Sequence, residues 1–228
     1  MTKSNRDLAT AEEGFSLISN QKLLSLYTTM LACRRIAEQA GNIRATRSAD
    51  SVLGHEASVV GTAIDLLPQD TATHTLSPDA AFAAANSSVT ISPSLKQAVR
   101  SAADSKSGQI TVVLAGGKLV AQPAWHKALA LAADKRLPIL FVVLSGQAGS
   151  NAEAGELHIP QTENEPSLPL INVDGNDVVA VYRVATEAIT HARKGHGPAL
   201  IDCRPSTASD PIENMRKYLI GKGIDPAA

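Results

Sequence analysis

The sequence predicts an α/β fold with a mainly parallel sheet and helices on both of its faces. Three observations predict it. Short apolar runs at residues 110–115, 139–144 and 199–203 are typical of strands that are buried on both faces. Stretches with apolar residues at helical spacing separate most of the expected strands. Because a helix between two strands normally joins them in parallel, the chain is expected to form one open parallel sheet.

The composition is that of a folded domain that has no polyanion partner. The chain has 228 residues, of which 44% are hydrophobic and 19% are charged. Its net charge of -1 and its aromatic content of 3% argue against binding of nucleic acid or of an anionic membrane. No apolar run approaches membrane-spanning length and no secretory signal is visible, so we expect a cytoplasmic location. Cys33 and Cys203 lie far apart in the sequence and are expected to be buried thiols.

The chain is expected to have two parts, a flexible N-terminal arm at residues 1–19 and a single α/β domain at residues 20–228. Asn20 is a plausible N-cap for a long amphipathic helix that ends near Gly41. A second helix is expected at residues 56–66, because Pro68 would terminate it.

The rest of the domain is expected to alternate between strands and helices. Ser92 is a candidate N-cap, with Pro93 at the first helical position. Residues 146–167 have no periodicity and are interpreted as a long loop. In order, we expect a strand at 71–76, helices at 78–85 and 93–103, a strand at 110–115, a helix at 125–135, strands at 139–144 and 170–173, a helix at 177–193, a strand at 199–203 and a helix at 211–220.

The candidate ligand-binding residues follow two neighbouring strands. Ligands in parallel sheets bind outside the carboxyl ends of the strands. Those ends are followed here by Gly116, Gly117 and Lys118, and by Ser145 and Gly146. The first group lacks the leading glycine and the hydroxyl of a Walker loop, and the second lacks the glycine of a nucleophile elbow. A strand-ending turn and a loop hydroxyl are therefore the simpler interpretations.

Histidines give one further candidate. No two of the six histidines have the spacing of a zinc-binding pair on one helix. His55 opens the helix expected at residues 56–66, near the expected cleft, and we retain it as a candidate for ligand contact.

Several segments, in order along the chain, resemble one enzyme family. They are Leu23 to Arg35, Gly54-His55-Glu56-Ala57, Ile171 to Tyr182 with Ala192 to Ile201, and Asp210 to Leu219. Together they resemble the alpha subunit of the thiamine-diphosphate-dependent decarboxylating component of 2-oxo acid dehydrogenase complexes, of the pyruvate, branched-chain and acetoin types. The resemblance covers residues 21–223. It implies the thiamine-diphosphate-binding fold, and specifically the half that grips the diphosphate.

The resemblance also implies a cofactor site that these residues do not match. Magnesium would bind a Gly-Asp-Gly turn and an asparagine, because it needs hard oxygen ligands. Those positions fall on Gly116, Gly117 and Lys118, and on Ser145 and Gly146, so carboxylate and amide are both missing. The family's Tyr-Arg phosphate clamp falls on Leu76 and Ser77. We therefore expect a vestigial cofactor site with no catalytic residue, no metal ligand and no bound cofactor. Its candidate residues are His55, Gly116, Gly117, Lys118, Ser145 and Gly146.

Two functions follow from the resemblance. The first is a non-catalytic dehydrogenase component that serves in assembly or binding. The alternative is an active thiamine-diphosphate-dependent oxidoreductase that decarboxylates a 2-oxo acid together with a beta-type subunit. A partner is expected in both cases, either a second copy in a symmetric homodimer or a beta-type dehydrogenase subunit.

Overall fold

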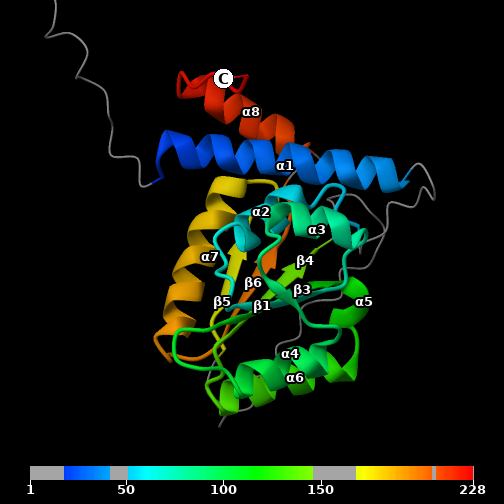
Figure 1. The fold of residues 1–228 in the computed structure, drawn as a ribbon, viewed down its shortest axis with the longest axis vertical. Coiled ribbons are helices and arrows are strands. Elements are labelled where there is room, and N and C mark those ends of the chain that lie inside the picture. Colours follow the sequence, from blue (N-terminus) through cyan, green and yellow to red (C-terminus); the bar gives the residue numbers. More distant parts are fainter. Residues whose placement is uncertain (1–17, 42–50, 146–167, 207–208, 228) are drawn as a thin grey trace, which may run out of the picture.

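A computed structural model describes residues 18–41, 51–145, 168–206 and 209–227. Within them lies a six-stranded, all-parallel sheet in the order β2-β1-β3-β4-β6-β5, with helices on both faces (Figure 1). This confirms the predicted fold class. The strands are β1 (Thr71–His74), β2 (Thr90–Ile91), β3 (Thr111–Gly116), β4 (Ile139–Leu144), β5 (Leu170–Val173) and β6 (Ala199–Cys203). The helices are α1 (Asn20–Gly41), α2 (Glu56–Ala63), α3 (Asp79–Ala85), α4 (Leu95–Ala103), α5 (Gly117–Val120), α6 (Pro123–Asp134), α7 (Val178–Arg193) and α8 (Pro211–Gly221).

The central strands β3 and β4 divide the interior into two hydrophobic cores. Successive side chains of a strand point to opposite faces of the sheet, so neighbours in sequence belong to different cores. Val112 and Leu114 pack in the core that includes residues of α1, α2, α3 and α7. Val113 packs with residues of α4 and α6 on the other face. There Trp125 meets Phe141 edge to face, with ring centroids 5.3 Å apart.

Helices α2 and α7 approach each other closely because a glycine lies between them. A Cβ atom at Gly61 would be 2.9 Å from Cγ1 of Val181 and 3.0 Å from the backbone nitrogen of Tyr182. Any side chain at this position would push the two helices apart. The close packing places α7 along one side of the molecule, while α8 lies across α1 at one end (Figure 1).

Most of the expected elements are confirmed, and the differences lie at their ends. Helix α2 ends at Ala63 rather than at residue 66, because Leu66 N donates to Ala63 O in a tight turn. The N-cap of α4 is Ser94, whose hydroxyl accepts a hydrogen bond from Gln97 N, so the expected cap at Ser92 is wrong. Ser92 is buried beside β1, and its N–H donates to Ala72 O.

Two short elements were not expected from the sequence. Strand β2 and helix α5 are too brief to produce a periodic pattern. Residues 146–167, expected to form a long loop, and most of the arm at residues 1–19 lie outside the described residues. No helix in the described part is long and apolar enough to cross a membrane.

Candidate functional site

The strand order places a ligand crevice at the carboxyl edge of the sheet. Strand β1 pairs with β2 on one side and with β3 on the other, so the strand order reverses between β1 and β3. Such a switch point opens a crevice outside the carboxyl ends of the strands. The register aligns Gly116 of β3 with Leu144 of β4, and Leu144 with Cys203 of β6. The candidate residues after β3 and β4 therefore lie at one edge.

At the end of β3, the backbone already has an internal partner. Gly116 N donates to the hydroxyl of Thr75, which follows β1, over 2.9 Å. Gly117 begins the four-residue helix α5, and a Cβ atom there would meet no atom within 4 Å. Lys118 is exposed on α5. The expected turn is thus the junction of a strand and a short helix, with open space at Gly117.

At the end of β4, the side chain of Ser145 binds a buried carboxylate. Its hydroxyl donates to Oδ1 of Asp202 over 2.7 Å, and Arg204 Nη2 lies 2.9 Å from Oδ2 of the same residue. Asp202 lies within the apolar strand β6 and is 2% exposed. Asp202 was not among the candidate residues predicted from the sequence, although a single acidic residue inside an apolar run is a signal that could have identified it. Gly146 lies outside the described residues.

His55 lies near the same edge, at the N-cap of α2. The stretch before it runs beside the segment that follows β1, because Val52 N donates to Ser77 O over 3.2 Å. The imidazole is buried and makes no capping hydrogen bond. Burial lowers the pKa of His55, since the charged form would lose its hydration. His55 is therefore a neutral side chain at neutral pH.

An ion-pair network beside His55 ties three helices together. Glu56 of α2 is fully buried and accepts from Gly54 N over 3.0 Å and from Arg34 Nε of α1 over 2.5 Å. Arg34 Nη1 also lies 2.8 Å from Asp210 Oδ2, at the N-cap of α8. Burial opposes the charge on Arg34, but its bonds to Glu56 and Asp210 raise its pKa above the usual value. This network was not predicted from the sequence.

A third acidic group lies at the carboxyl end of β5. Asp174 accepts from Asn176 N over 2.9 Å and from the hydroxyl of Ser206. Burial opposes ionisation of Asp174, but these hydrogen bonds hold its pKa below the usual value. A hollow of about 240 Å³ opens beside it between the start of α7 and α8. The carboxylates of Asp202, Glu56 and Asp174 are therefore already engaged by protein groups.

These positions do not fit a divalent metal in the way that the resemblance implies. Gly117 has no side chain at the position of the metal-binding carboxylate, and the hydroxyl of Ser145 is directed to Asp202. Within the described ranges, no group of three or more histidine, cysteine, aspartate or glutamate side chains could hold a metal ion.

Comparison with known proteins decides the family. The family model described as "Dehydrogenase E1 component" matches residues 47–205, which include every strand of the sheet. The chain belongs to the dehydrogenase E1 component family. It is 40% identical over 86 residues to the alpha subunit of an acetoin:2,6-dichlorophenolindophenol oxidoreductase of Bacillus subtilis, over 36% of this chain and 26% of that protein.

Two further relatives of this E1-family chain are also alpha subunits. It is 31% identical over 142 residues to chloroplastic pyruvate dehydrogenase E1 component subunit alpha-3 of Arabidopsis thaliana, over 49% of this chain and 32% of that protein. It is 33% identical over 142 residues to the 3-methyl-2-oxobutanoate dehydrogenase subunit alpha of Mycobacterium tuberculosis, over 50% of this chain and 39% of that protein. The matched regions thus span only between a quarter and four tenths of these relatives' lengths.

Family membership corrects one expectation. The substituted ligand positions led to the prediction that no cofactor binds. That expectation is wrong as stated, because the relatives of this E1-family chain are thiamine-diphosphate-dependent alpha subunits and nothing shows that the cofactor has been lost. The substitutions at Gly117 and Ser145 change the ligand set of the expected metal position, but they do not establish what this edge binds.

Proposed function

We propose that this chain is a 2-oxo acid dehydrogenase alpha-type protein whose role is assembly or binding rather than catalysis. One observation carries the proposal. At the two positions where the family resemblance implies metal ligands, the chain has Gly117, without a side chain, and Ser145, whose hydroxyl binds Asp202. His55 is buried, and burial lowers its pKa, so its imidazole accepts a proton less readily than that of an exposed histidine.

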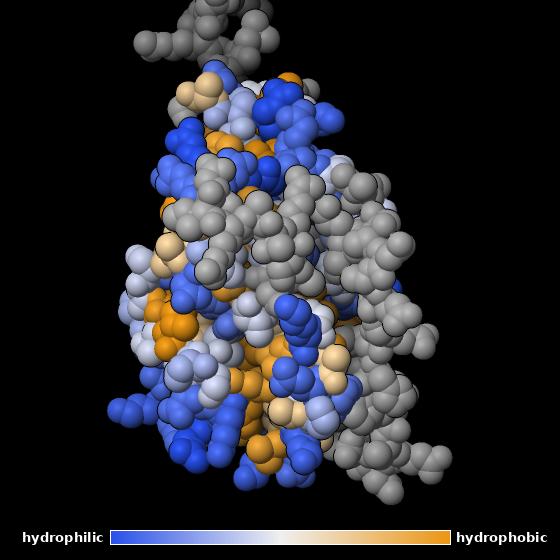
Figure 2. All heavy atoms as spheres, turned by 90° about the vertical axis from the view of Figure 1, so that its right-hand side faces the viewer, coloured by the Kyte–Doolittle hydropathy of each residue, from blue (hydrophilic) through white to orange (hydrophobic). Residues whose placement is uncertain are grey.

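The proposal requires a partner surface. Two of the exposed large hydrophobic residues, Tyr218 and Ile220, lie on α8 and are 39% and 52% exposed. Leu170, at the start of the sheet-edge strand β5, is 40% exposed. Hydrophobic side chains also gather in the lower half of the face seen in Figure 2. The apolar area in the lower half of Figure 2 is the kind of surface that favours association, because single exposed apolar side chains are common on monomeric proteins. Either a second copy of this chain or a beta-type dehydrogenase subunit would cover it.

The deciding experiment measures turnover and binding separately. The full chain is produced alone and with a beta-type subunit from the same organism, then supplied with thiamine diphosphate, magnesium, and pyruvate or 3-methyl-2-oxobutanoate. The proposal expects a complex by light scattering, with no release of carbon dioxide above that of the beta-type subunit alone. Turnover that depends on this chain would overturn the non-catalytic role. A strictly monomeric chain that binds no beta-type subunit would overturn the assembly role.

A second candidate function is an active thiamine-diphosphate-dependent oxidoreductase, which family membership favours. Thermal unfolding with thiamine diphosphate and magnesium, with and without a chelator, addresses it directly. A ligand at a hundredfold over its dissociation constant adds about 2.7 kcal/mol to the free energy of unfolding. Gly117→Asp restores the carboxylate at the expected metal position and is the matched variant for the natural chain. The side chain can be accommodated, because a Cβ atom at Gly117 meets no atom within 4 Å. A chelator-sensitive shift in the natural chain, together with turnover, would support this candidate.

A further inference from the structure

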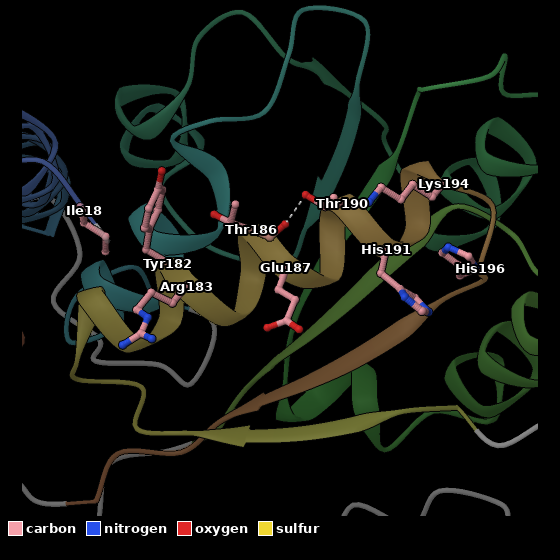
Figure 3. A pocket seen from close by; sticks show the side chains of 9 residues that line it. All are labelled: Ile18, Tyr182, Arg183, Thr186, Glu187, Thr190, His191, Lys194 and His196. Atoms are coloured by element: carbon pink, nitrogen blue, oxygen red, sulfur yellow. Dashed lines mark hydrogen bonds between the residues drawn. The ribbon is translucent and has the colours of Figure 1, made fainter. Parts of the chain in front are cut away.

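The end of α7 brings two histidine rings together, away from the carboxyl edge of the sheet. His191 lies in the last turn of the helix, and His196 lies in the loop that leads into β6. Their ring centroids are 4.7 Å apart, and the ring planes are inclined by 33°. Both residues are exposed and line a groove of about 580 Å³ along α7 (Figure 3). Because α7 returns the chain from the end of β5 to the start of β6, the pair lies at the amino edge of the sheet.

The backbone at the end of α7 explains why these two rings meet. Gly195 has a φ of +79°, in the left-handed region that favours glycine, and its N–H donates to Ala192 O over 3.0 Å. His196 N donates to His191 O over 3.3 Å. These two bonds form a Schellman motif, in which the side chains at the positions of His191 and His196 commonly make a hydrophobic contact. Here two imidazoles take the place of that contact.

The spacing of the rings suits a transition-metal ion bound between them. Zinc binds histidine nitrogens at about 2.0–2.1 Å in a tetrahedral arrangement. The centroid of each ring then lies roughly 3.2 Å from the ion, and the two centroids lie roughly 5 Å apart. The observed separation of 4.7 Å is close to this value. Because both side chains are exposed, rotation about their own bonds can turn one nitrogen of each ring towards the ion.

The protein supplies two ligands and a favourable field. In the described part of the chain, no group of three histidine, cysteine, aspartate or glutamate side chains could hold a metal ion, so water completes the coordination shell of an ion held by this pair. The C-terminal end of a helix carries a partial negative charge, which favours a cation. Glu187, one turn before His191 on the same helix, adds a carboxylate to the groove.

Three cationic residues lie along the same part of α7. Arg193 is paired with Asp70. Arg183 precedes His191 by eight residues, about 12 Å along the helix at 1.5 Å per residue. Figure 3 shows the side chain of Lys194 directed back along α7, away from the imidazoles. Arg183 and Lys194 are exposed, so water and salt screen their repulsion of a bound cation.

We propose that His191 and His196 together bind one divalent transition-metal ion of the zinc, nickel or copper class. Imidazole nitrogen suits these ions, whereas magnesium prefers oxygen ligands. A bound ion fastens the last turn of α7 to the loop that enters β6. This inference does not depend on the proposed function, because it uses no residue of the carboxyl edge.

Isothermal titration calorimetry of the full, untagged chain with zinc chloride tests the site. One ion should bind per chain, and magnesium chloride should not compete with it. His191→Ala and His196→Ala should each weaken zinc binding by about a hundredfold, because the second ligand of a chelate binds at a high effective concentration. His126→Gln is the matched control and should leave binding unchanged, since it removes a partly exposed histidine from another helix.

Three calorimetric results would overturn the proposal. The first is an absence of zinc binding to the natural chain. The second is a single variant that keeps its affinity and loses only part of the capacity, which would show two separate sites instead of one chelate. The third is binding that survives both substitutions or that His126→Gln abolishes, which would place the ion elsewhere.

Thermal unfolding gives an independent readout. Zinc should raise the unfolding midpoint of the natural chain, because the ion joins two groups that are held together only in the folded motif. The same concentration should leave the midpoints of His191→Ala and His196→Ala unchanged. An equal rise in the natural chain and in both variants would contradict binding by this pair.

Discussion

The hydroxyl of Ser145 donates a hydrogen bond of 2.7 Å to the buried carboxylate of Asp202, across the neighbouring strands β4 and β6. Ser145→Ala removes that donor and leaves Asp202 with Arg204. Loss of one hydrogen bond to a buried charge should lower the free energy of unfolding by about 1.5–3 kcal/mol. Urea denaturation measures this change. An unchanged midpoint would show that solvent replaces the hydroxyl at no cost, and the edge would then be more open than the structure indicates.

Gly61 keeps α2 and α7 in contact, and its substitution should be destabilising. In an ordinary helix interior, a change from glycine to alanine stabilises by about 1 kcal/mol. At Gly61 the new Cβ atom would lie 2.9 Å from Cγ1 of Val181, so Gly61→Ala should cost about 1–3 kcal/mol. Gly221→Ala, where nothing lies within 4 Å of the added atom, is the control and should not destabilise. Equal thermal midpoints for the two variants would contradict the close packing.

Glu56 is the buried member of the network that joins α1, α2 and α8. Glu56→Gln leaves Arg34 partly buried without its main counter-charge. Breaking a fully buried ion pair from one side costs about 3–5 kcal/mol, and the loss should be smaller here because Arg34 is 21% exposed and keeps its ion pair with Asp210. Glu213→Gln, which removes a solvent-exposed ion pair with Arg216, should have little effect by comparison. Chemical denaturation measures the free energy of unfolding of both variants. Equal losses would show that the ion pair of Arg34 with Glu56 stabilises the fold no more than the exposed pair of Glu213 with Arg216.

One buried and one partly buried histidine predict that the free energy of unfolding falls in mildly acidic solution. Burial lowers the pKa of both His55 and His74, and for His74 it outweighs the opposing effect of the Asp79 carboxylate. The unfolded chain binds these protons more readily than the folded one. The free energy of unfolding therefore has its full value above the ordinary histidine pKa of about 6.5 and decreases as the pH falls below it. His74→Gln should reduce this pH dependence between pH 7.5 and 5.5, and an identical profile would exclude His74 as a contributor.

Both cysteines should resist thiol reagents until the chain unfolds. Burial, with a further contribution from Glu56, raises the pKa of Cys33 to about 12, and burial also raises the pKa of Cys203 to about 12. At pH 8 the thiolate fraction is then lower by on the order of a thousandfold than for an ordinary cysteine. A disulfide reagent should release colour only after denaturant is added. Rapid labelling of the native protein would contradict their burial.

The sequence was sufficient for the sheet and for most of its helices. The apolar runs at Ile139–Leu144 and Ala199–Cys203 are long enough to identify buried strands, and Asp177 and Asp210 act as N-caps where the expected helices begin. Strand β2 and helix α5 could not be predicted, because two and four residues contain no period. The N-cap of α4 was predicted at Ser92, two residues before its actual position at Ser94. Serine occurs at both positions, and only the backbone geometry selects one of them.

What the sequence determined by itself is the family, the α/β architecture, and the residue types at the carboxyl edge, because these depend on local patterns and residue identity. The tertiary structure decided which groups meet there. The Ser145 to Asp202 hydrogen bond joins residues 57 positions apart, and the Arg34 to Asp210 pair joins residues 176 positions apart. No local pattern encodes such contacts, since they arise only when strand register and helix packing bring distant segments together.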